Sequence, residues 1–522
     1  MKQRRARTRI VPVALLLGLL AAACGGSDPS VTVKSASAIA TEPVATVPAP
    51  DGSVPADTDP AGSVPDTTDT TDTSDTNGPA DDGAADGVGD EMFPALGNPG
   101  IDVVDYDVRL RYDPTLDAIA GSVVLTIVAT DTRDSFTLDA IGLDIASVDV
   151  DGVDATFAAE DVELRITPPE PLAPGRLIVV DVAYSGAPDA GSSATLLPNG
   201  WFHSDGGSYV LNQPDGARTW LPSNDHPSDK ATWTFEITVP SGTTAVANGA
   251  LQSTTAGPDG DTWVWRQDDP MPTYLVQLLT GDYQIIETTG PNGLPLVSAV
   301  LRADLAGVQQ YIDGIPAQID FFDDVFGPYP LDRYGIAVTD SFPGLAMETM
   351  GRSMFSNQDL DGTAGSFTEL LLSHELAHQW FGDAVSPARW QDIWLNESFA
   401  SYGQWLWFEH SGRATLDEQA SAALASRFGP ATGLPEVDDM FGYNSYDGGA
   451  VVLHALRLTI GDDAFFTLLQ RWVSENTGTS RTTDDFIALA EDVAGTDLTA
   501  FFDTWLFADD VPLSYPASTP IA

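Results

Sequence analysis

Cysteine is nearly absent from this chain, because Cys24 is the only one among 522 residues. A single cysteine excludes an intramolecular disulfide and any metal site built from cysteines. Basic residues are also scarce: 23 Lys and Arg face 76 Asp and Glu, which gives a formal net charge of -53. Phosphate binding requires a basic patch, so this balance argues against nucleic acid as a partner. The length is sufficient for several domains with ample core.

Long apolar runs are lacking as well. The run from Ile10 to Leu20 follows a basic N-terminus and is too short to span a bilayer comfortably. It ends at Leu20-Ala-Ala-Ala-Cys24, which resembles a bacterial lipobox. We therefore expect a signal peptide over residues 1–23, cleavage before Cys24 and a lipid on its sulfur. An ordinary signal peptide and a twin-arginine signal at Arg4-Arg5 remain the alternatives.

Residues 24–92 contain few apolar side chains and carry a Thr/Asp repeat from Thr67 to Thr76. A segment of this composition cannot bury enough surface to offset the entropy of ordering. We expect a disordered acidic tether that holds the folded part away from a membrane or through a wall layer.

Two regions with different sequence patterns follow the tether. Residues 93–288 show period-two alternation, as in Tyr106 to Tyr112 and Trp233 to Val239, separated by turn signals. They predict an N-terminal β domain, an antiparallel sheet or sandwich. Residues 289–522 are mainly helical, and a multidomain α+β chain is the expected fold class. The expected helices are 305–326, 366–381, 393–410, 415–427, 448–460, 463–474 and 484–493, with a short strand over 334–339.

The second region contains the sequence His374-Glu375-Leu-Ala-His378. Ser366 with Glu369 reads as a capping box and Gly382 as a residue just past the helix end, so both histidines should lie on one helix. Histidines at i and i+4 share a helical face and can converge on one metal. Glu375 is offset from them and suits a general base.

A catalytic zinc site requires a third protein ligand. Glu397 lies 19 positions after His378, on a second predicted helix that has Asp392 as a possible N-cap and Gly412 just past its end. Two antiparallel helices would return Glu397 to the histidines. Two imidazoles and a carboxylate favour one Zn²⁺ per chain, although cobalt or manganese could substitute.

Together these residues resemble the signature of the gluzincin aminopeptidases, the group of aminopeptidase N and leukotriene hydrolase. The resemblance extends from about Asp102 onward and implies a β saddle followed by a thermolysin-like catalytic domain. Leu345-Ala346-Met347-Glu348-Thr349 is similar to the family's G-A-M-E-N motif, with Leu and Thr replacing Gly and Asn. It implies that Ala346, Met347 and Glu348 bind substrate, with the Glu348 carboxylate pairing with a free amino terminus.

Other segments fit the same family. Tyr446-Asp-Gly-Gly-Ala450 is similar to its Y-x-K-G-A segment, so Tyr446 is expected to stabilise the oxyanion, with Tyr443 as the neighbour that could take this role. Gln213, five residues before Arg218, matches a position that assists recognition of the substrate amino group. Met271 to Val276 fits the family's last β-domain strand.

These residues predict a zinc-dependent aminopeptidase that acts on peptides with a free amino terminus. It is expected to be a monomer, extracytoplasmic and lipid-anchored to the bacterial cell membrane. The alternatives are a zinc endopeptidase of the same fold and a non-catalytic peptide-binding lipoprotein. The chain stops soon after Phe501 to Trp505, which resembles the end of the catalytic domain. We therefore expect the large C-terminal helical domain of many relatives to be missing and the site to be more open, which argues against a leukotriene-type epoxide hydrolase.

Overall fold

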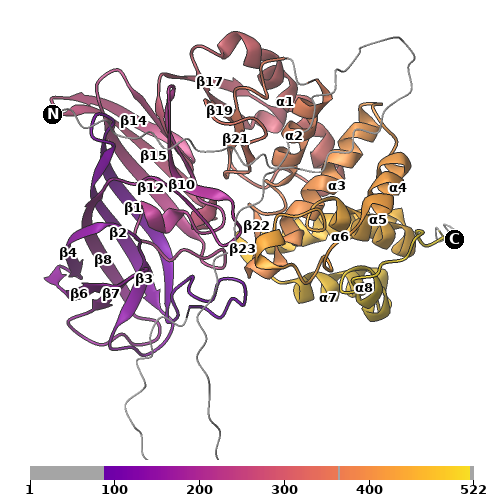
Figure 1. Ribbon diagram of the computed structural model, residues 1–522, viewed down its shortest axis with the longest axis horizontal. Coiled ribbons are helices and arrows are strands. Elements are labelled where there is room, and N and C mark those ends of the chain that lie inside the picture. The colour runs from indigo at the N-terminus through magenta and orange to yellow at the C-terminus, as the bar shows by residue number, and fades with distance from the viewer. Residues whose placement is uncertain (1–86, 363–364, 518–522) are drawn as a thin grey trace, which may run out of the picture. The chain divides into compact units, whose positions relative to one another are not determined.

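Strands with alternating burial form the first part of the computed structural model, which describes residues 87–362 and 365–517 (Figure 1). In β1 (Ile101–Asp113) the apolar residues from Tyr106 to Tyr112 are buried, as their period-two pattern predicts. β1 is antiparallel to β2 (Ala118–Ala129) but parallel to β12 (Ala231–Val239), which comes much later in the chain. The predicted antiparallel sheet therefore contains a parallel pair.

Three sheets make up this β part. The largest has the order β14-β15-β12-β1-β2-β8-β4-β5, and the smaller two have the orders β13-β16-β11-β10-β9 and β3-β7-β6. Their remaining strands are β3 (Phe136–Asp139), β4 (Asp144–Val150), β5 (Val153–Asp154), β6 (Thr156–Ala159), β7 (Glu163–Thr167), β8 (Leu177–Gly186), β9 (Ala190–Ser192), β10 (Pro198–Ser204), β11 (Gly207–Leu211), β13 (Thr244–Ala247), β14 (Ala250–Gly257), β15 (Gly260–Met271) and β16 (Leu278–Gly281).

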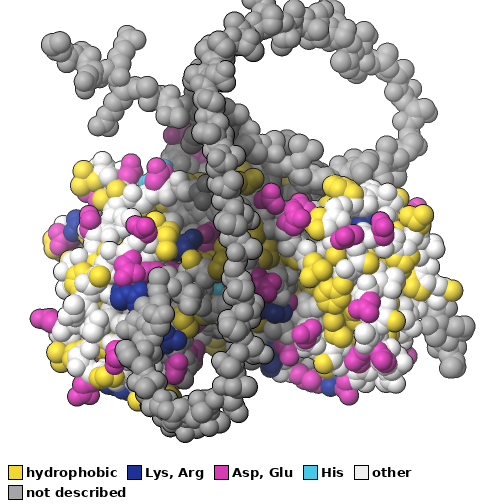
Figure 2. Space-filling view, turned by 60° about the horizontal axis from the view of Figure 1, so that its bottom comes forward, with side chains coloured by type: hydrophobic (Ala, Val, Ile, Leu, Met, Phe, Trp, Pro, Cys, Tyr) yellow, Lys and Arg dark blue, Asp and Glu magenta, His cyan; other side chains and the backbone are white. Residues whose placement is uncertain are grey.

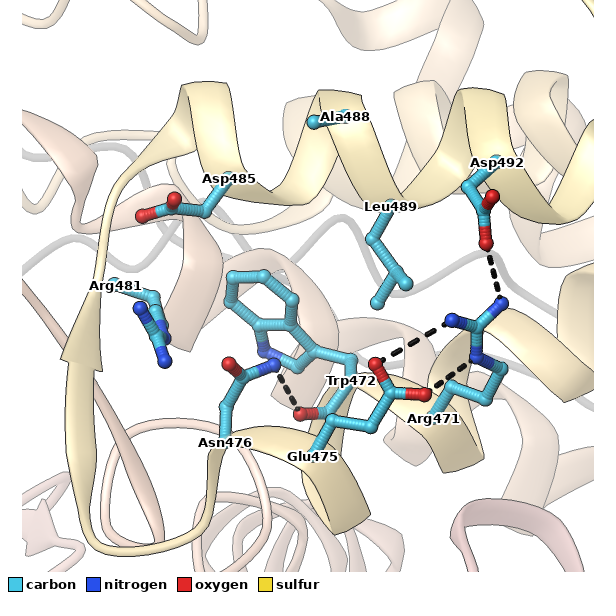
Figure 3. A pocket seen from close by; sticks show the side chains of 9 residues that line it. All are labelled: Arg471, Trp472, Glu475, Asn476, Arg481, Asp485, Ala488, Leu489 and Asp492. Carbon is cyan, nitrogen blue, oxygen red and sulfur yellow. Dashed lines mark hydrogen bonds and ion pairs between the residues drawn. The ribbon is translucent and has the colours of Figure 1, made fainter.

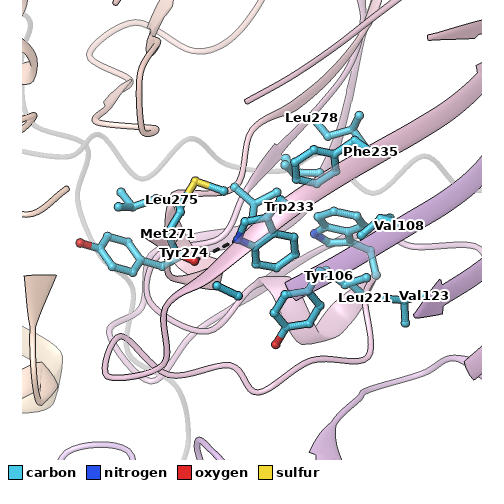
Figure 4. Packing of buried hydrophobic residues seen from close by; sticks show 14 of the residues in the cluster. Tyr106, Val108, Val123, Leu221, Trp233, Phe235, Met271, Tyr274, Leu275 and Leu278 are labelled. Atoms are coloured by element: carbon cyan, nitrogen blue, oxygen red, sulfur yellow. Dashed lines mark hydrogen bonds between the residues drawn. The ribbon is translucent and has the colours of Figure 1, made fainter. Parts of the chain in front are cut away.

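Aromatic rings fill the core of the β part (Figure 4). Trp233 stacks on Tyr106 with ring centroids 3.9 Å apart and on Phe235 at 5.6 Å. Its indole N–H donates a hydrogen bond of 3.0 Å to the main-chain oxygen of Met271. Burying one such side chain contributes about 1.5–3 kcal/mol, so this cluster holds the end of β15 firmly.

The prediction of a strand over Met271 to Val276 is wrong. Met271 ends β15, and Pro272 is the N-cap of a 3₁₀ helix, η2 (Thr273–Leu275). A proline has no N–H for a strand ladder, which explains why the strand stops there. The last strand of the β part is instead β16.

The end of the predicted tether is also folded. Asp90 is buried, and its carboxylate accepts hydrogen bonds from the main-chain N–H groups of Phe93 at 3.0 Å and Trp390 at 2.6 Å. The same carboxylate lies 3.2 Å from Nε2 of His226. The prediction of a disordered tether is therefore wrong for residues 87–92. The rest of that segment, Cys24 and the predicted signal peptide lie outside the described residues.

The second part begins with a mixed sheet of order β17-β18-β19-β21-β20. Its strands are β17 (Tyr283–Thr289), β18 (Pro295–Leu301), β19 (Ile336–Thr339), β20 (Ala346–Met347) and β21 (Ser353–Ser356). The predicted domain boundary between residues 288 and 289 falls at the end of β17, so this sheet has strands on both sides of it. β20 carries two residues of the expected substrate-binding motif, Ala346 and Met347.

Helices make up most of the regular structure in the second part, as the sequence predicts, and the α+β class is confirmed. They are α1 (Leu305–Phe326), α2 (Ser366–Ala377), α3 (Trp394–His410), α4 (Leu416–Ser426), α5 (Asp447–Ile460), α6 (Asp462–Asn476), α7 (Thr483–Ala494) and α8 (Thr499–Trp505). Helix α1 lies between β18 and β19, and the others follow the sheet. Short elements complete the described part: β22 (Val385–Pro387), β23 (Thr479–Arg481), η1 (Ala217–Thr219), η3 (Pro291–Gly293), η4 (Trp390–Asp392) and η5 (Val437–Asp439). Among the α-helices of the described residues, only α8 lacks a counterpart in the prediction, because seven residues are too few to display a helical period.

The surface reflects the composition. Figure 2 shows acidic side chains spread over the visible face rather than gathered into one patch. None of the helices in the described ranges is both long and apolar enough to cross a membrane.

Candidate metal centre

Helix α2 presents the two histidines; it begins at Ser366, as predicted, but ends four residues before the predicted end at Phe381. Its N-cap is Gly365, at φ 59°, and not Ser366 as predicted, and the carboxylate of Glu369 pairs with Arg413. The helix ends at Ala377, and His378 is the C-cap, from which the chain turns sharply. Gly382 adopts φ 123°, a conformation that side chains rarely tolerate, which explains a glycine there.

Helix α3 carries Glu397, the predicted third ligand, back to the two histidines. Glu397 lies in its first turn and is 2% exposed. Asp392 does not cap this helix, contrary to the prediction, because the N-cap is Ile393. The Asp392 carboxylate instead accepts a hydrogen bond of 3.1 Å from the main-chain N–H of Thr483, at the start of α7. Asp392 therefore fixes α7 beside α3.

The three predicted ligand atoms converge. Nε2 of His374 lies 3.1 Å from Nε2 of His378, and Oε2 of Glu397 lies 3.4 Å and 3.3 Å from these two nitrogens. Ligand atoms about 2.1 Å from a tetrahedral zinc lie ~3.4 Å from one another. The donor set and its spacing therefore fit Zn²⁺.

Neighbouring groups set the protonation states of these ligands so that they can bind a cation. Nδ1 of His378 lies 3.1 Å from the main-chain oxygen of Phe381, which can only accept a hydrogen bond. This hydrogen bond keeps a proton on Nδ1, so Nε2 is the nitrogen of this ring that would bind a metal. Burial raises the pKa of Glu397, but His378 and His374 outweigh burial and lower the pKa to about 2, so this carboxylate is ionised.

Glu375 adjoins the same centre. A carboxylate oxygen of Glu375, one of Glu348 and a nitrogen of His378 all lie within 4.8 Å of one another. Burial raises the pKa of Glu375 well above its usual value, and the negative charges of Glu348 and Glu397 add to this effect, whereas His378 lowers it. A carboxylate of raised basicity beside a metal centre suits a general base.

Glu348 directly follows β20 and is 3% exposed. Its Oε1 accepts a hydrogen bond of 2.9 Å from Nε2 of Gln213, so the structure brings these two predicted residues together from distant parts of the chain. The hydroxyl of Thr349 donates to the main-chain oxygen of Arg352 at 2.6 Å and accepts from Nε2 of Gln277 at 2.8 Å. The threonine that replaces the family's asparagine thus closes the turn beside Glu348.

Tyr446 also lies at the centre. Its ring stacks on the His374 imidazole with centroids 5.7 Å apart, and burial together with Glu397, Glu348 and Glu375 raises its pKa well above the usual value. Its hydroxyl therefore stays protonated and can donate. The hydroxyl of the alternative residue, Tyr443, donates instead to the main-chain oxygen of Ala423 at 2.8 Å, so the geometry favours Tyr446.

Sequence reasoning missed three residues that support the centre. Nε2 of Gln379 donates to the main-chain oxygen of Glu348 at 3.2 Å, and its place directly after His378 is a signal that could have found it. Tyr274 and Lys230 donate to main-chain oxygens in the turn after His378. No local pattern marks these two, because their partners lie more than a hundred positions away.

Another concavity, of about 350 Å³, lies along α6, α7 and β23. Figure 3 shows Arg471 on one side of it, joined by dashed lines to Glu475 and Asp492. The guanidinium of Arg471 lies 2.6 Å from Oε1 of Glu475 and 2.8 Å from Oδ2 of Asp492. The charges of Arg471 and of the two carboxylates thus compensate one another. The pocket contains neither of the potential metal-binding groups found among the described residues. Both potential metal-binding groups of the described residues lie at the α2–α3 centre.

Comparison with known proteins gives two family matches that together cover both folded parts. The peptidase M1 N-terminal domain matches residues 103–275, and the peptidase family M1 domain matches residues 312–505. Among curated proteins, "Aminopeptidase 2" of Candida albicans is 25% identical over 435 residues, which are 76% of this chain and 46% of that protein. "Aminopeptidase M1-B" of Oryza sativa is 26% identical over 82% of this chain and 51% of its own length. The chain thus spans about half the length of these relatives.

Solved structures match more completely. An M1 zinc metallopeptidase from Deinococcus radiodurans, bound to a Tyr-Ser-Ala substrate, is 31% identical with a TM-score of 0.76. The match covers 83% of this chain and all of that one. A structure described as a two domain M1 zinc metallopeptidase bound to L-tryptophan gives the same scores and coverage.

Proposed function

Because the chain belongs to peptidase family M1, we propose that it is a zinc-dependent aminopeptidase that releases N-terminal residues from peptides. The observation that carries this proposal is the position of Glu348. Its carboxylate lies within 4.8 Å of Glu375 and His378, so an anchor for an amino terminus adjoins the metal ligands. The names of the curated relatives and the tripeptide bound to the Deinococcus protein support the same activity.

His374, His378 and Glu397 would hold one Zn²⁺ per chain. When bound, zinc supplies a Lewis acid that polarises a peptide carbonyl and makes water more acidic. Glu375 takes the proton of the attacking water on its carboxylate and delivers it to the leaving amine. Tyr446 donates its phenolic hydrogen bond to the negative oxygen that develops on the carbonyl.

Glu348 and Gln213 determine which peptide bond is cleaved. Glu348 pairs with the ammonium group of the first residue, and Gln213 orients this carboxylate through its 2.9 Å hydrogen bond. An ammonium held at Glu348 places the first peptide bond, and no later one, beside Glu375. This geometry favours an aminopeptidase over the endopeptidase alternative.

The proposal is tested with chromogenic aminoacyl amides, each paired with its N-acetylated twin, in the presence and absence of a chelator and added zinc. We expect turnover of the free amines only, loss of activity on chelation and recovery with zinc. Cleavage of the acetylated twins would replace the proposal with an endopeptidase. A zinc-loaded protein that cleaves none of the amides would be a peptide-binding protein instead.

We also propose that the protein is a monomer, anchored outside the cytoplasm through a lipid on Cys24. The lipobox-like sequence before Cys24 supports this localisation. Expression in a bacterial host with a labelled fatty acid tests it. Label should enter the wild-type protein but not Cys24→Ser, and equal labelling of both would refute the anchor.

A further inference from the structure

The β part holds the turn that follows the second histidine ligand. Nζ of Lys230 donates to the main-chain oxygens of Asp383 at 2.8 Å and Ala384 at 3.2 Å. The hydroxyl of Tyr274 donates to the main-chain oxygen of Gly382 at 3.1 Å. Three successive carbonyl groups of the turn thus accept hydrogen bonds from two side chains that lie far away in the sequence.

Tyr274 reaches both segments that carry ligands. Besides donating to Gly382, its hydroxyl accepts a hydrogen bond of 3.2 Å from Nδ2 of Asn396, the residue before Glu397. The Gly382 oxygen has a second donor, the hydroxyl of Ser386, but this residue lies in β22, only four positions after Gly382. Among these groups, the Tyr274 hydroxyl alone joins the segment of His378 to the segment of Glu397.

The support of Tyr274 is rigid. Its side chain is 1% exposed, and its ring packs edge-on against Trp390 with centroids 5.2 Å apart. Figure 4 shows it extending from η2, beside Met271 and Leu275, away from the stacked Trp233 cluster. Burial and the contact with Trp390 therefore fix the place of this hydroxyl.

A shift of the turn would reach the metal ligand directly. Nδ1 of His378 donates to the oxygen of Phe381, which neighbours Gly382. The imidazole plane thus follows the position of residues 381–384. Burial lowers the pKa of Lys230 to about 7, but its amine donates hydrogen bonds in either protonation state.

We infer that Tyr274 and Lys230 are positioning residues of the metal centre, through which the β part holds His378 and Glu397 at the spacing that zinc requires. This inference rests on the proposed function in that zinc is taken as the metal. Hydrogen bonds that orient ligands from outside typically change metal affinity 10- to 100-fold when they are removed. A merely structural contact between the two parts would change stability without changing zinc affinity.

Tyr274→Phe tests the inference, because it removes the hydroxyl and keeps the ring. Tyr283→Phe is the matched control: Tyr283 is also 1% exposed, and its hydroxyl donates to Oγ1 of Thr339 at 2.8 Å, outside the centre. Zinc dissociation constants are measured by competition with a chromophoric chelator, and folding by circular dichroism and thermal melting.

We expect Tyr274→Phe to raise the zinc dissociation constant at least tenfold and Tyr283→Phe to leave it within twofold, while both lower the melting temperature slightly. Equal zinc affinity of Tyr274→Phe and the control would overturn the inference. Should Tyr274→Phe not fold, Lys230→Met takes its place with the same expectation. Zinc affinity is read without turnover, so a wild-type protein that binds zinc but cleaves no peptide refutes the proposed function alone. A wild-type protein that binds no zinc refutes both.

Discussion

Glu348→Gln separates recognition of the amino terminus from the chemistry. The amide keeps the shape of the side chain and an oxygen that can accept the hydrogen bond from Gln213, so the substitution removes little except the charge. The Glu348 carboxylate is 3% exposed, and solvent therefore screens its attraction for a substrate ammonium weakly.

The expected fall in kcat/KM follows from the loss of the negative charge of Glu348. A hydrogen bond to a charged group contributes about 1.5–3 kcal/mol, which corresponds to a fall in kcat/KM of about 10- to 150-fold for substrates with a free amino terminus. Any residual turnover of an N-acetylated twin should not change, because that substrate has no ammonium. The ratio of the two rates is the quantity to measure, with zinc content determined for each variant.

Gln213→Ala provides the second arm of a double-mutant cycle. Alone it removes a hydrogen bond to the carboxylate, and a fall of about 2- to 10-fold is expected. In the Glu348→Gln background the effect should shrink, because Gln213 acts by orienting Glu348. Equal losses on free and acetylated substrates, or fully additive effects of the two substitutions, would refute the assignment of these residues to the amino terminus.

Three further predictions concern the remaining groups. Glu375→Gln should abolish turnover while the zinc content, measured by elemental analysis, stays at the wild-type level; an active variant would exclude Glu375 as the base. Tyr446→Phe should lower kcat by about 10²- to 10³-fold with a small change in KM, whereas Tyr443→Phe should not, and equal losses from both would remove the oxyanion role from Tyr446. Burial and mutual repulsion raise the pKa of Asp139 to about 7, and burial raises that of Glu163 to about 7 as well. Because the folded values exceed the unfolded values near 4, this pair contributes stability that is lost as the pH rises from about 4 to about 7. Glu163→Gln should weaken this dependence in urea unfolding at a series of pH values, and an unchanged dependence would contradict it.

The local part of the site could be predicted from the sequence. The His374 and His378 nitrogens converge because four residues make about one helical turn, and Glu397 follows on the next helix, so short-range geometry suffices. Asp392 shows the limit of such reasoning. It resembles an N-cap, but Thr483, 91 residues later, offers it better donors. The N-cap preference of a residue is judged from its neighbours in the sequence. It therefore cannot reveal a hydrogen-bond donor that only the tertiary fold brings close.

Long-range pairing was equally hidden. Alternation identified β1 and β12 as strands, but their parallel contact, such as Tyr106 opposite Trp233, depends on how the intervening strands fold back. Tyr274 was predicted to lie on a strand because Met271 to Val276 resembles the last β-domain strand of the family. Pro272 ends the strand instead, and the hydroxyl of Tyr274 donates to the main-chain oxygen of Gly382, in the turn after His378.

The position of Asp90 has a mechanical consequence. Its single carboxylate bonds to the main chain of Trp390 in the second part and contacts His226 in the β part. A pulling force applied to the chain before residue 87 therefore acts on both parts where they meet at Asp90. The first bonds to carry this force are the hydrogen bonds of the Asp90 carboxylate. In a single-molecule pulling experiment from the N-terminus, the detachment of residues 87–92 should be the first rupture event, and Asp90→Asn should lower its force.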